Sequence, residues 1–291
     1  MKQYIFWTDD EIAKLKELSG RMNFQQMTKH FSGRTAPSLQ KKAIKLKLVS
    51  DYRYKKHSHD ENFFETPNEV NSYYGGFCAM DCHINHRNQF TLSLASKDLE
   101  HLENFKNAVK FTGNIRTYQR KKYKQEGLKW VSTLNICSVT QWRIDLKRHF
   151  NVEENKTYRL APPNITDRKL ILSYLVGTFD GDGWICRGKN GSGIVFGLVS
   201  SSYKFLEWVK KQLEIEFNGL ENIKIHKSNH GNYYTYVISS GKCAVILDRL
   251  RKLPVPKLAR KWENPELLAK LEEYKLKHPE FFTNPAPIPI T

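Results

Sequence analysis

An internal repeat of about one hundred residues limits how this chain can fold. Between residues 67 and 263, one order of segments occurs twice: a helix rich in small and apolar residues, a strand, an amphipathic helix, a pair of basic strands and a closing helix. The two opening segments are SYYGGFCAMDC and SYLVGTFDGDG, which begin at residues 72 and 173. The repeat predicts an α+β fold made of two pseudo-symmetric αββαββα halves.

Shorter segments flank the two repeats. The first fifty residues predict three helices, because Thr8 and Glu11 form a capping box and Thr35 with Pro37 begins a further helix. A polar stretch without periodicity predicts a linker after them. The expected boundaries are 1–50 for the helical unit, 51–66 for the linker, 67–163 for the first repeat, 164–263 for the second repeat, and 264–291 for a C-terminal helix with a proline-rich tail.

The N-terminal unit resembles Myb/SANT-like helix-turn-helix modules. The resemblance rests on Trp7, on the run Phe31-Ser-Gly-Arg34-Thr35, and on Lys42-Ala43 before Leu46. Residues 1–60 hold thirteen basic residues against six acidic ones, which favours DNA over the alternative of a three-helix adaptor that binds protein. The residues expected to contact DNA from this unit are Arg34, Lys41, Lys42 and Lys45.

The whole chain is strongly basic. It has 47 Lys and Arg residues against 30 Asp and Glu residues, for a net charge of +17. Two windows, 104–125 and 222–242, contain basic residues and no acidic ones. Because a solvated surface normally mixes the two signs, these windows favour a partner that carries phosphate, namely nucleic acid.

Several other classes of protein are excluded by composition. No apolar run approaches the ~18–20 residues that a membrane span needs, so no membrane partner is expected. The N-terminal MKQYIFWTDDE lacks the apolar core of a signal peptide. Five cysteines without a paired spacing favour a reducing compartment over a disulfide framework. We expect a cytoplasmic protein of a bacterial or phage-infected cell, with an organellar host left open.

The opening helices of the two repeats carry the most specific motif. Residues 175–183 read LVGTFDGDG and residues 74–82 read YGGFCAMDC, which sets Asp81 and Asp182 101 residues apart. Both stretches resemble the motif of the LAGLIDADG homing endonuclease family. The resemblance extends over both repeats. It implies a DNA-binding saddle that cuts both strands of a long, non-palindromic target, leaves short 3′ overhangs and serves intron mobility.

The first copy of the motif is degenerate. It departs from the family pattern at Ala79, Met80 and Cys82, where the pattern has an acidic or small residue, a small residue and glycine. The metal-holding position of the family is retained as Asp81. The resemblance therefore still implies one metal-binding carboxylate from each repeat.

The two aspartates are expected to meet at one negative site. Glycines such as Gly76 and Gly177 allow two helices to pack with their backbones close together. Each helix would end near its aspartate, where the carbonyl groups are also partly negative, so a cation is needed there. A hard divalent ion suits such oxygen ligands. The resemblance implies Mg²⁺, with Mn²⁺ or Ca²⁺ as alternative occupants, held by Asp81 and Asp182 between two scissile phosphates.

Other ion and nucleotide sites fit these residues less well. An EF-hand loop that begins at Asp180 would need glutamate at position 191, which is Gly191. Residues 188–193 lack the spacing of a P-loop. A zinc site would have to draw on Cys78, Cys82, His83 and His86. No second ligand cluster accompanies these four residues, so buried cysteines are the simpler interpretation.

Two lysines and two serines complete the expected active site. Lys156 and Lys257 each follow the aspartate of their repeat by 75 residues. The family resemblance implies a role for such lysines in stabilising charge on the phosphate, although a lysine-rich chain also produces matched pairs by chance. Ser96 and Ser200 follow the first strand of each repeat, where ordinary turn serines are the favoured interpretation over active-site residues.

The basic strands are expected to contact double-stranded DNA, because a two-stranded ribbon fits the major groove and alternate side chains share one face. An ordinary solvated sheet face is the alternative. The residues expected to contact DNA from the two repeats are Arg116, Tyr118, Arg120, Lys121, Lys122, Lys124, Lys224, His226, Lys227, Tyr234 and Tyr236.

Three functions remain open at this point. The favoured one is a monomeric, Mg²⁺-dependent DNA endonuclease with an accessory helix-turn-helix. The second is an RNA-binding maturase that helps an intron fold, and the third is a catalytically silent DNA-binding regulator on the same fold. Retention of both aspartates favours the enzyme but leaves a dual role with intron RNA open.

Overall fold

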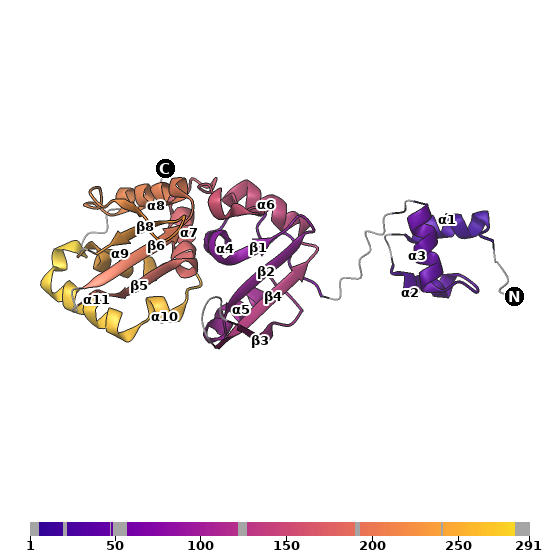
Figure 1. The fold of residues 1–291 in the computed structure, drawn as a ribbon, viewed down its shortest axis with the longest axis horizontal. Coiled ribbons are helices and arrows are strands. Elements are labelled where there is room, and N and C mark those ends of the chain that lie inside the picture. The colour runs from indigo at the N-terminus through magenta and orange to yellow at the C-terminus, as the bar shows by residue number, and fades with distance from the viewer. Residues whose placement is uncertain are drawn as a thin grey trace. The chain divides into compact units, whose positions relative to one another are not determined.

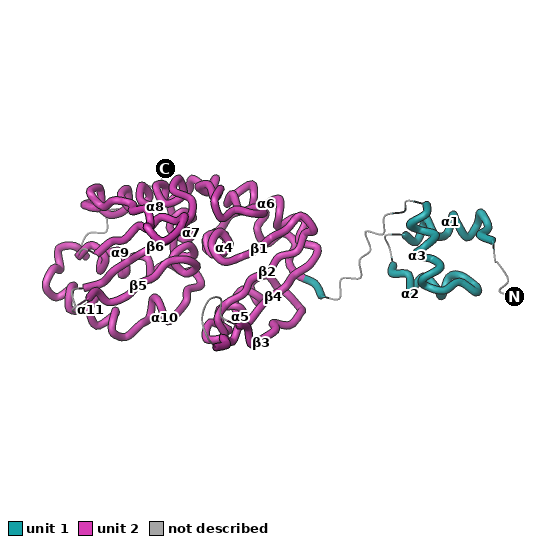
Figure 2. The backbone as a smooth tube through the Cα atoms, in the orientation of Figure 1, with its two compact units in different colours: residues 1–58 teal, residues 59–291 magenta. Residues whose placement is uncertain are grey.

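The computed structural model describes residues 6–19, 22–46, 48, 57–121, 127–189, 193–239 and 241–282. The chain forms two compact units, residues 1–58 and residues 59–291 (Figure 2). Residues 59–66, which the sequence assigns to a linker, belong to the second unit, where the buried Phe64 ring packs edge-on against Trp142.

The N-terminal unit contains α1 (Asp9–Leu18), α2 (Phe24–Met27), the short 3₁₀ helix η1 (Thr28–His30) and α3 (Ala36–Lys45). Thr8 and Glu11 form the expected capping box of α1, and the Thr35 hydroxyl caps α3. The buried residues of its small core are Leu15, Met27, Phe31, Leu39 and Ala43. The apolar stripes of three short helices therefore pack into a core of their own.

The second unit contains the two repeats in the predicted α+β order (Figure 1). The first repeat consists of α4 (Glu69–Asp81), β1 (Cys82–Ile84), β2 (Gln89–Ala95), α5 (Leu99–Ala108), β3 (Arg116–Lys121), β4 (Leu128–Cys137) and α6 (Thr140–Phe150). The second repeat consists of α7 (Arg168–Gly181), β5 (Gly183–Arg187), β6 (Ile194–Ser200), α8 (Tyr203–Glu216), β7 (Ile225–Lys227), β8 (Tyr234–Ile238) and α9 (Lys242–Arg251). The predicted fold class is thus confirmed.

Each repeat builds one antiparallel four-stranded sheet with the same topology. The strand orders are β1-β2-β4-β3 and β5-β6-β8-β7. The registers also correspond: Cys82 pairs with Leu92, and Gly183 pairs with Leu198 at the equivalent place. Leu92 and Leu198 are fully buried against the helices, so one face of each sheet forms the core. We call the opposite face the outer face.

The helices α4 and α7 lie side by side at the junction of the two repeats (Figure 1). Most of their residues are buried, which accounts for the apolar character of both helices on all sides. A Cβ atom on Gly76 would lie 2.0 Å from the carbonyl oxygen of Tyr174. A Cβ atom on Gly177 would lie 1.9 Å from the carbonyl oxygen of Tyr73. The two glycines therefore permit a backbone contact that no larger residue allows.

A buried carboxylate ties the later helices to this junction. Asp180, on α7, is almost fully buried and accepts a hydrogen bond of 2.7 Å from the hydroxyl of Tyr73 on α4. It also accepts hydrogen bonds from the backbone N–H of Leu258 and the indole N–H of Trp262, at 2.9 and 2.7 Å. Burial raises the pKa of Asp180, and these hydrogen bonds oppose the rise because they stabilise the charged form.

The chain continues from α9 into α10 (Ala259–Trp262), α11 (Pro265–Lys277) and the 3₁₀ helix η5 (Pro279–Phe281). Arg260, on α10, forms a bidentate ion pair with Asp98 in the first repeat, in which two guanidinium nitrogens donate to the two carboxylate oxygens at 2.7 and 3.0 Å. This pair links the end of the second repeat to the first. Among the described residues, none of the helices has the length and apolar character needed to span a membrane.

Candidate active site

Asp81 and Asp182 lie at the adjacent ends of the two central helices. Asp81 is the last residue of α4, and Asp182 is the C-cap of α7. The helix ends are in close contact, since a Cβ atom on Gly181 would lie 2.3 Å from the Cβ atom of Met80. The repeat therefore brings one carboxylate from each half to one place, as the motif predicts.

The electrostatics of this site disfavour two free negative charges. Burial, and then the negative charge of Asp182, raise the pKa of Asp81 to about 6. Partial loss of solvent also raises the pKa of Asp182, and the positive charges of Lys156 and Lys261 oppose that rise. The two carboxylates thus lie where a further positive charge would stabilise their ionised forms.

Lys156 lies beside the two aspartates. It begins the short 3₁₀ helix η3 (Lys156–Tyr158), and its ammonium group donates a hydrogen bond of 2.5 Å to the carbonyl oxygen of Cys82. This carbonyl follows directly after Asp81 at the end of α4. Lys156 therefore has the position expected of it, and its catalytic role stays a prediction.

Lys257 lies in a different environment. Its ammonium group donates hydrogen bonds to the carbonyl oxygens of Leu253 and Val255, at 2.5 and 3.0 Å. The charges that act on it come from Asp180, Glu263 and Arg251, and burial lowers its pKa. Neither Asp81 nor Asp182 is among these neighbours. The geometry therefore gives no support to a role for Lys257 in catalysis.

Lys261, rather than Lys257, lies against the end of α7 that precedes Asp182. It lies on α10, is 6% exposed, and donates hydrogen bonds of 2.7 to 2.8 Å to the carbonyl oxygens of Phe179, Asp180 and Gly183. Burial lowers the pKa of Lys261 to about 8, while the charges of Asp180 and Asp81 oppose this. A cation at the C-terminal end of α7 balances the partly negative carbonyls there.

A cavity of about 240 Å³ opens beside Asp182. Its lining includes Lys156 and Asp182, Val199 and Ser200 of β6, and Tyr233, which precedes β8. The Ser200 hydroxyl also accepts a hydrogen bond from the backbone N–H of Ser202, as a turn serine would. Ser96 instead accepts a hydrogen bond of 3.2 Å from the Ser132 hydroxyl, and it is not part of this cavity.

The two cysteines that were considered as zinc ligands are residues of the hydrophobic core. Cys78 and Cys82 are buried free cysteines of the core beside α4. Within the described ranges, no group of three or more His, Cys, Asp or Glu side chains is arranged to hold a metal ion. Asp81 and Asp182 remain the residues expected to hold a metal ion, and that role stays a prediction.

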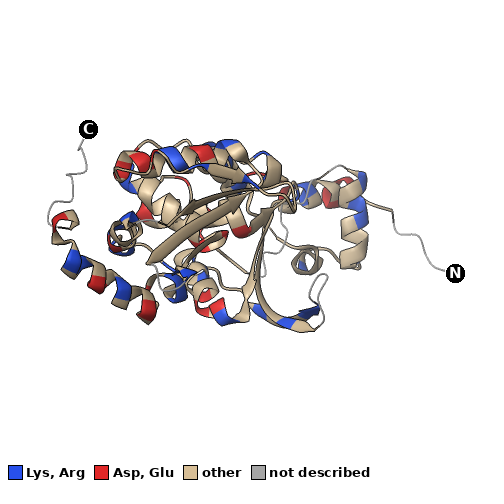
Figure 3. Cartoon of the chain, turned by 60° about the vertical axis from the view of Figure 1, so that its left-hand side comes forward, with Lys and Arg blue, Asp and Glu red and all other residues tan. Residues whose placement is uncertain are grey.

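The first repeat exposes the predicted basic strand. All six residues of β3 are exposed, including Arg116, Tyr118, Arg120 and Lys121. Three of these six residues, Arg116, Arg120 and Lys121, are basic, and the basic residues of the chain are blue in Figure 3. Lys122 and Lys124, also expected to contact DNA, lie outside the described residues. The exposed cations of β3 remain available to a phosphate-bearing partner.

The second repeat differs from the prediction at its tyrosines. Lys224, His226 and Lys227 are exposed, as expected of residues that contact DNA. Tyr236, however, is 1% exposed because its strand pairing with Leu198 directs it into the core. Tyr234 shares that face, is half-buried, and packs edge-on against Tyr203. The expectation that Tyr236 contacts DNA is therefore wrong, and Tyr234 offers at most part of its ring.

One residue of the N-terminal unit that was expected to contact DNA is engaged in contacts within the unit itself. The Arg34 side chain is 6% exposed and binds both carboxylate oxygens of Glu11, at 2.7 and 2.8 Å. Its guanidinium group also lies 4.3 Å from the ring centre of Trp7. Arg34 thus stabilises the fold of the unit, whereas Lys41 and Lys45 are exposed and Lys42 is partly exposed on α3.

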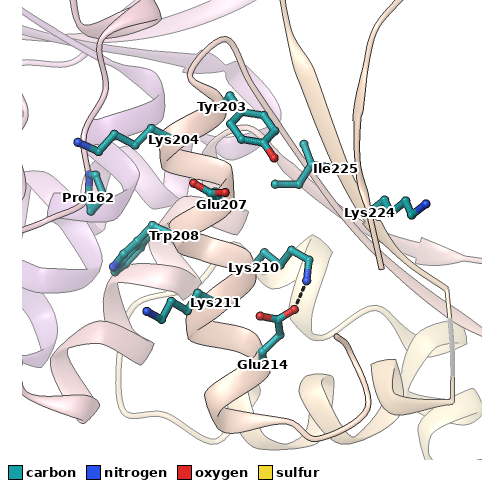
Figure 4. A pocket seen from close by; sticks show the side chains of 10 residues that line it. All are labelled: Pro162, Tyr203, Lys204, Glu207, Trp208, Lys210, Lys211, Glu214, Lys224 and Ile225. Atoms are coloured by element: carbon teal, nitrogen blue, oxygen red, sulfur yellow. Dashed lines mark hydrogen bonds and ion pairs between the residues drawn. The ribbon is translucent and has the colours of Figure 1, made fainter. Parts of the chain in front are cut away.

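A larger hollow of about 820 Å³ lies over α8 (Figure 4), and neither Asp81 nor Asp182 is among its lining residues. Lys204, Lys210 and Lys211 of α8 line it, and so does Lys224, which immediately precedes β7. Lys210 is already paired with Glu214 (Figure 4). We assign no catalytic role to this hollow, because the paired helix ends lie elsewhere.

The raised pKa of Asp81 predicts a pH-dependent effect on stability. Burial raises the pKa of the Asp81 carboxyl to about 6 in the folded protein, compared with its ordinary value of 3.8 in an unfolded chain. Between these values the folded state binds more protons, so the contribution of Asp81 to stability falls as the pH rises. In chelator-treated protein, we expect Asp81→Asn to raise the free energy of unfolding at pH 7 by on the order of 1–2 kcal/mol, and by much less at pH 4.

Urea unfolding at the two pH values measures this difference. Asp10→Asn, which removes an exposed carboxylate from α1, is the matched control and should change stability little at either pH. A loss of stability for Asp81→Asn at pH 7 would mean that the carboxylate is favourably paired, contrary to the raised pKa.

Comparison with known proteins agrees with this geometry in the second repeat. Residues 169–250 match the family model described as a LAGLIDADG-like domain. This stretch begins in α7 and ends in α9, so it includes Asp182 and the second sheet. The second repeat therefore contains a LAGLIDADG-like domain. A search of curated proteins found no match to the chain.

Solved structures with a similar arrangement share little sequence with this chain. The homing endonuclease I-WcaI bound to its DNA recognition sequence is 16% identical, with 72% of this chain and 91% of that chain covered and a TM-score of 0.44. I-SmaMI bound to an uncleaved DNA target with calcium ions is 14% identical, with 75% and 96% covered and a TM-score of 0.41.

A third similar structure is the full-length DUF199/WhiA protein from Thermatoga maritima. It is 20% identical, with 76% of this chain covered and a TM-score of 0.42. The chain spans 64% of the length of that protein, which is less than two thirds.

Proposed function

We propose that this protein is a site-specific, divalent-metal-dependent endonuclease that cuts double-stranded DNA as a monomer. The observation that carries the proposal is the meeting of Asp81 and Asp182 at the ends of two helices whose glycines bring the backbones into contact. Each repeat contributes one carboxylate, so a single chain completes the site. The match of residues 169–250 to a LAGLIDADG-like domain supports the same proposal.

In this proposal Asp81 and Asp182 would hold Mg²⁺, or Mn²⁺ or Ca²⁺ in its place. When bound, the ion supplies positive charge to the scissile phosphate and to the attacking water. Lys156 and Lys261 lie close enough to act on the charges of both aspartates, and Lys156 lines the adjacent cavity. Lys156 would stabilise the negative charge that develops on the phosphate, and Lys261 would hold the end of α7 in place.

A catalytically silent DNA-binding regulator is the second candidate. The same two lysines favour it, because two ammonium groups beside two carboxylates can balance their charge without a metal ion. The two candidates differ in one outcome, the breaking of phosphodiester bonds, and they share the exposed basic strands.

Selection from a randomised duplex library tests the proposal. Full-length protein would first enrich bound sequences in metal-free buffer, and the enriched DNA would then be incubated with Mg²⁺, Mn²⁺ or chelator. We expect cuts on both strands within the enriched sequence, and only with a divalent ion. Enrichment without cleavage under any ion would favour the silent regulator. Failure to enrich DNA, together with enrichment from a parallel library of structured RNA, would favour a maturase.

We also propose that the N-terminal unit is an accessory DNA-binding module of the helix-turn-helix kind. The exposed lysines of α3, Lys41 and Lys45, with the partly exposed Lys42, support this. Replacing all three with glutamine should weaken DNA binding and make its dependence on salt shallower, by about 0.9 in the logarithmic slope per lost phosphate contact.

Affinity measured by fluorescence anisotropy at several salt concentrations checks this prediction. The matched control is Lys14→Gln with Lys16→Gln, which removes two exposed lysines from α1. An unchanged affinity and slope for the α3 variant would favour a protein-binding adaptor.

A further inference from the structure

The outer faces of the two sheets can be compared position by position. Because the registers correspond, Gln89, Thr91 and Ser93 of β2 are equivalent to Val195, Gly197 and Val199 of β6. By the same pairing, Asn135 of β4 is equivalent to Val237 of β8, and His83 of β1 is equivalent to Trp184 of β5. The two repeats share a backbone but present different chemistry on this face.

The outer face of the first sheet is polar. Thr91 donates a hydrogen bond of 2.8 Å to the side-chain oxygen of Asn135, and the hydroxyls of Ser93 and Thr133 lie 2.9 Å apart. Gln89 and Asn135 are exposed. Glutamine and asparagine side chains can bind adenine through two hydrogen bonds in the major groove. The adjacent β3 adds exposed arginines, which suit guanine or phosphate.

At the positions equivalent to Gln89, Ser93 and Asn135, the outer face of the second sheet carries valines, while Thr235 also lies on this face. Val195, Val199 and Val237 are each partly exposed on it, since alternate residues of these strands fill the core instead. The Trp184 ring covers Gly197, since a Cβ atom on this glycine would be 2.0 Å from the ring. The glycine therefore seats an aromatic ring beside the valines. The result is an apolar strip at the positions where the first sheet has hydrogen-bonding groups.

The strip is continuous with the candidate active site. Val199 lines the same cavity as Asp182, and Trp184 follows Asp182 by two residues. His226, exposed on β7, pairs in register with Thr235 and borders the strip on its far side. The apolar strip thus lies between the candidate active site and the exposed His226 of β7. A partner that binds at the candidate active site would therefore also contact the strip.

We infer that the second repeat recognises thymine-rich DNA through contacts between this apolar strip and thymine methyl groups, whereas the first repeat recognises its half-site by hydrogen bonds. The inference rests on the proposed function. The thymine methyl is the apolar feature of the major groove, and valine-type side chains match it without leaving polar atoms unpaired. The target would then have one half-site rich in A·T pairs and one of mixed composition.

Replacing thymine with uracil tests the inference, because uracil lacks only the methyl group. The enriched duplex would be remade with uracil in either half-site and its affinity measured in metal-free buffer. We expect about a threefold to fourfold loss of affinity for each contacted thymine in the second half-site. The same replacement in the first half-site should change affinity by less than twofold.

Two matched variants assign the half-sites. Val237→Asn introduces the side chain that the first sheet has at the equivalent position, and it should remove the uracil effect at the thymine that Val237 contacts and shift base preference in one half-site only. Gln89→Val is the reciprocal control in the first sheet and should alter preference in the other half-site.

The outcomes separate this inference from the proposed function. Specific binding with equal or absent uracil effects, or a second half-site rich in G·C pairs, would overturn the inference and leave the nuclease proposal standing. A library with no enriched sequence would instead contradict the proposed function, and it would favour a protein partner or a second copy of the chain on the apolar strip.

Discussion

Replacing Asp182 with asparagine should reduce the rate of DNA cleavage about a thousandfold or more while leaving DNA affinity nearly unchanged. A ligand that holds a catalytic ion contributes several kcal/mol of charge stabilisation in the transition state, and about 4 kcal/mol corresponds to that factor. Asparagine keeps the shape of the residue and removes one negative charge. Asp81→Asn should have an effect of the same size, since each repeat contributes one carboxylate.

Cleavage of the enriched target under single-turnover conditions measures the rate, and binding in metal-free buffer measures affinity. Asp10→Asn provides the control for loss of one carboxylate far along the chain from both motifs. Wild-type cleavage by either motif variant would exclude the two-aspartate site. A parallel loss of affinity and rate would point to misfolding rather than to lost metal binding.

Gly177→Ala should destabilise the second unit by about 3 kcal/mol or more. A Cβ atom at this position would lie 1.9 Å from the backbone carbonyl oxygen of Tyr73, so the two central helices would have to move apart. Overpacking typically costs about 1–3 kcal/mol in stability. The cost should be at the upper end or above it here, because the clashing atom belongs to the backbone and cannot rotate away as a side chain could. For a unit of this size, the expected fall in melting temperature is roughly 6–12 °C.

Thermal and urea unfolding check this prediction, with Gly231→Ala as the matched control. A Cβ atom there would meet the Tyr233 ring at 2.9 Å, and that ring belongs to a side chain that can move. The control should therefore change stability by less than about 1 kcal/mol. Equal stability of Gly177→Ala and wild type would mean that the helices do not pack through this glycine.

The parts of the structure that follow from local pattern could be predicted from the chain alone. The 101-residue spacing of the two glycine-and-aspartate motifs gave two equivalent halves, and the equivalent strand orders confirm that expectation. Glycines that allow close helix packing are visible in a sequence because only a missing side chain permits that contact. The meeting of Asp81 and Asp182 follows from the same pairing of helices.

Spacing along the chain did not identify Lys261, the lysine that binds the carbonyl groups at the end of α7. Lys257 follows its aspartate by the same number of residues as Lys156, yet it is Lys261 that contacts the end of α7. The two repeats differ here in local structure, since Lys156 begins a 3₁₀ helix whereas Lys261 lies within α10. A spacing argument assumes that both repeats use the same path after their closing helices. A buried ammonium group is recognised by its carbonyl partners, and these come from residues about eighty positions away.

Sequence alone established the duplication, the central pair of helices, the two motif aspartates and the basic character of the strands. These properties depend on residue type and on spacing along one chain. Only the tertiary structure decided which face of each strand meets solvent, and therefore that Tyr236 is core while Trp184 and the valines form an apolar outer strip. The reason is physical: a shift of one residue in strand register exchanges the two faces of a sheet, and register is determined by the packing of helices that lie far away in the sequence.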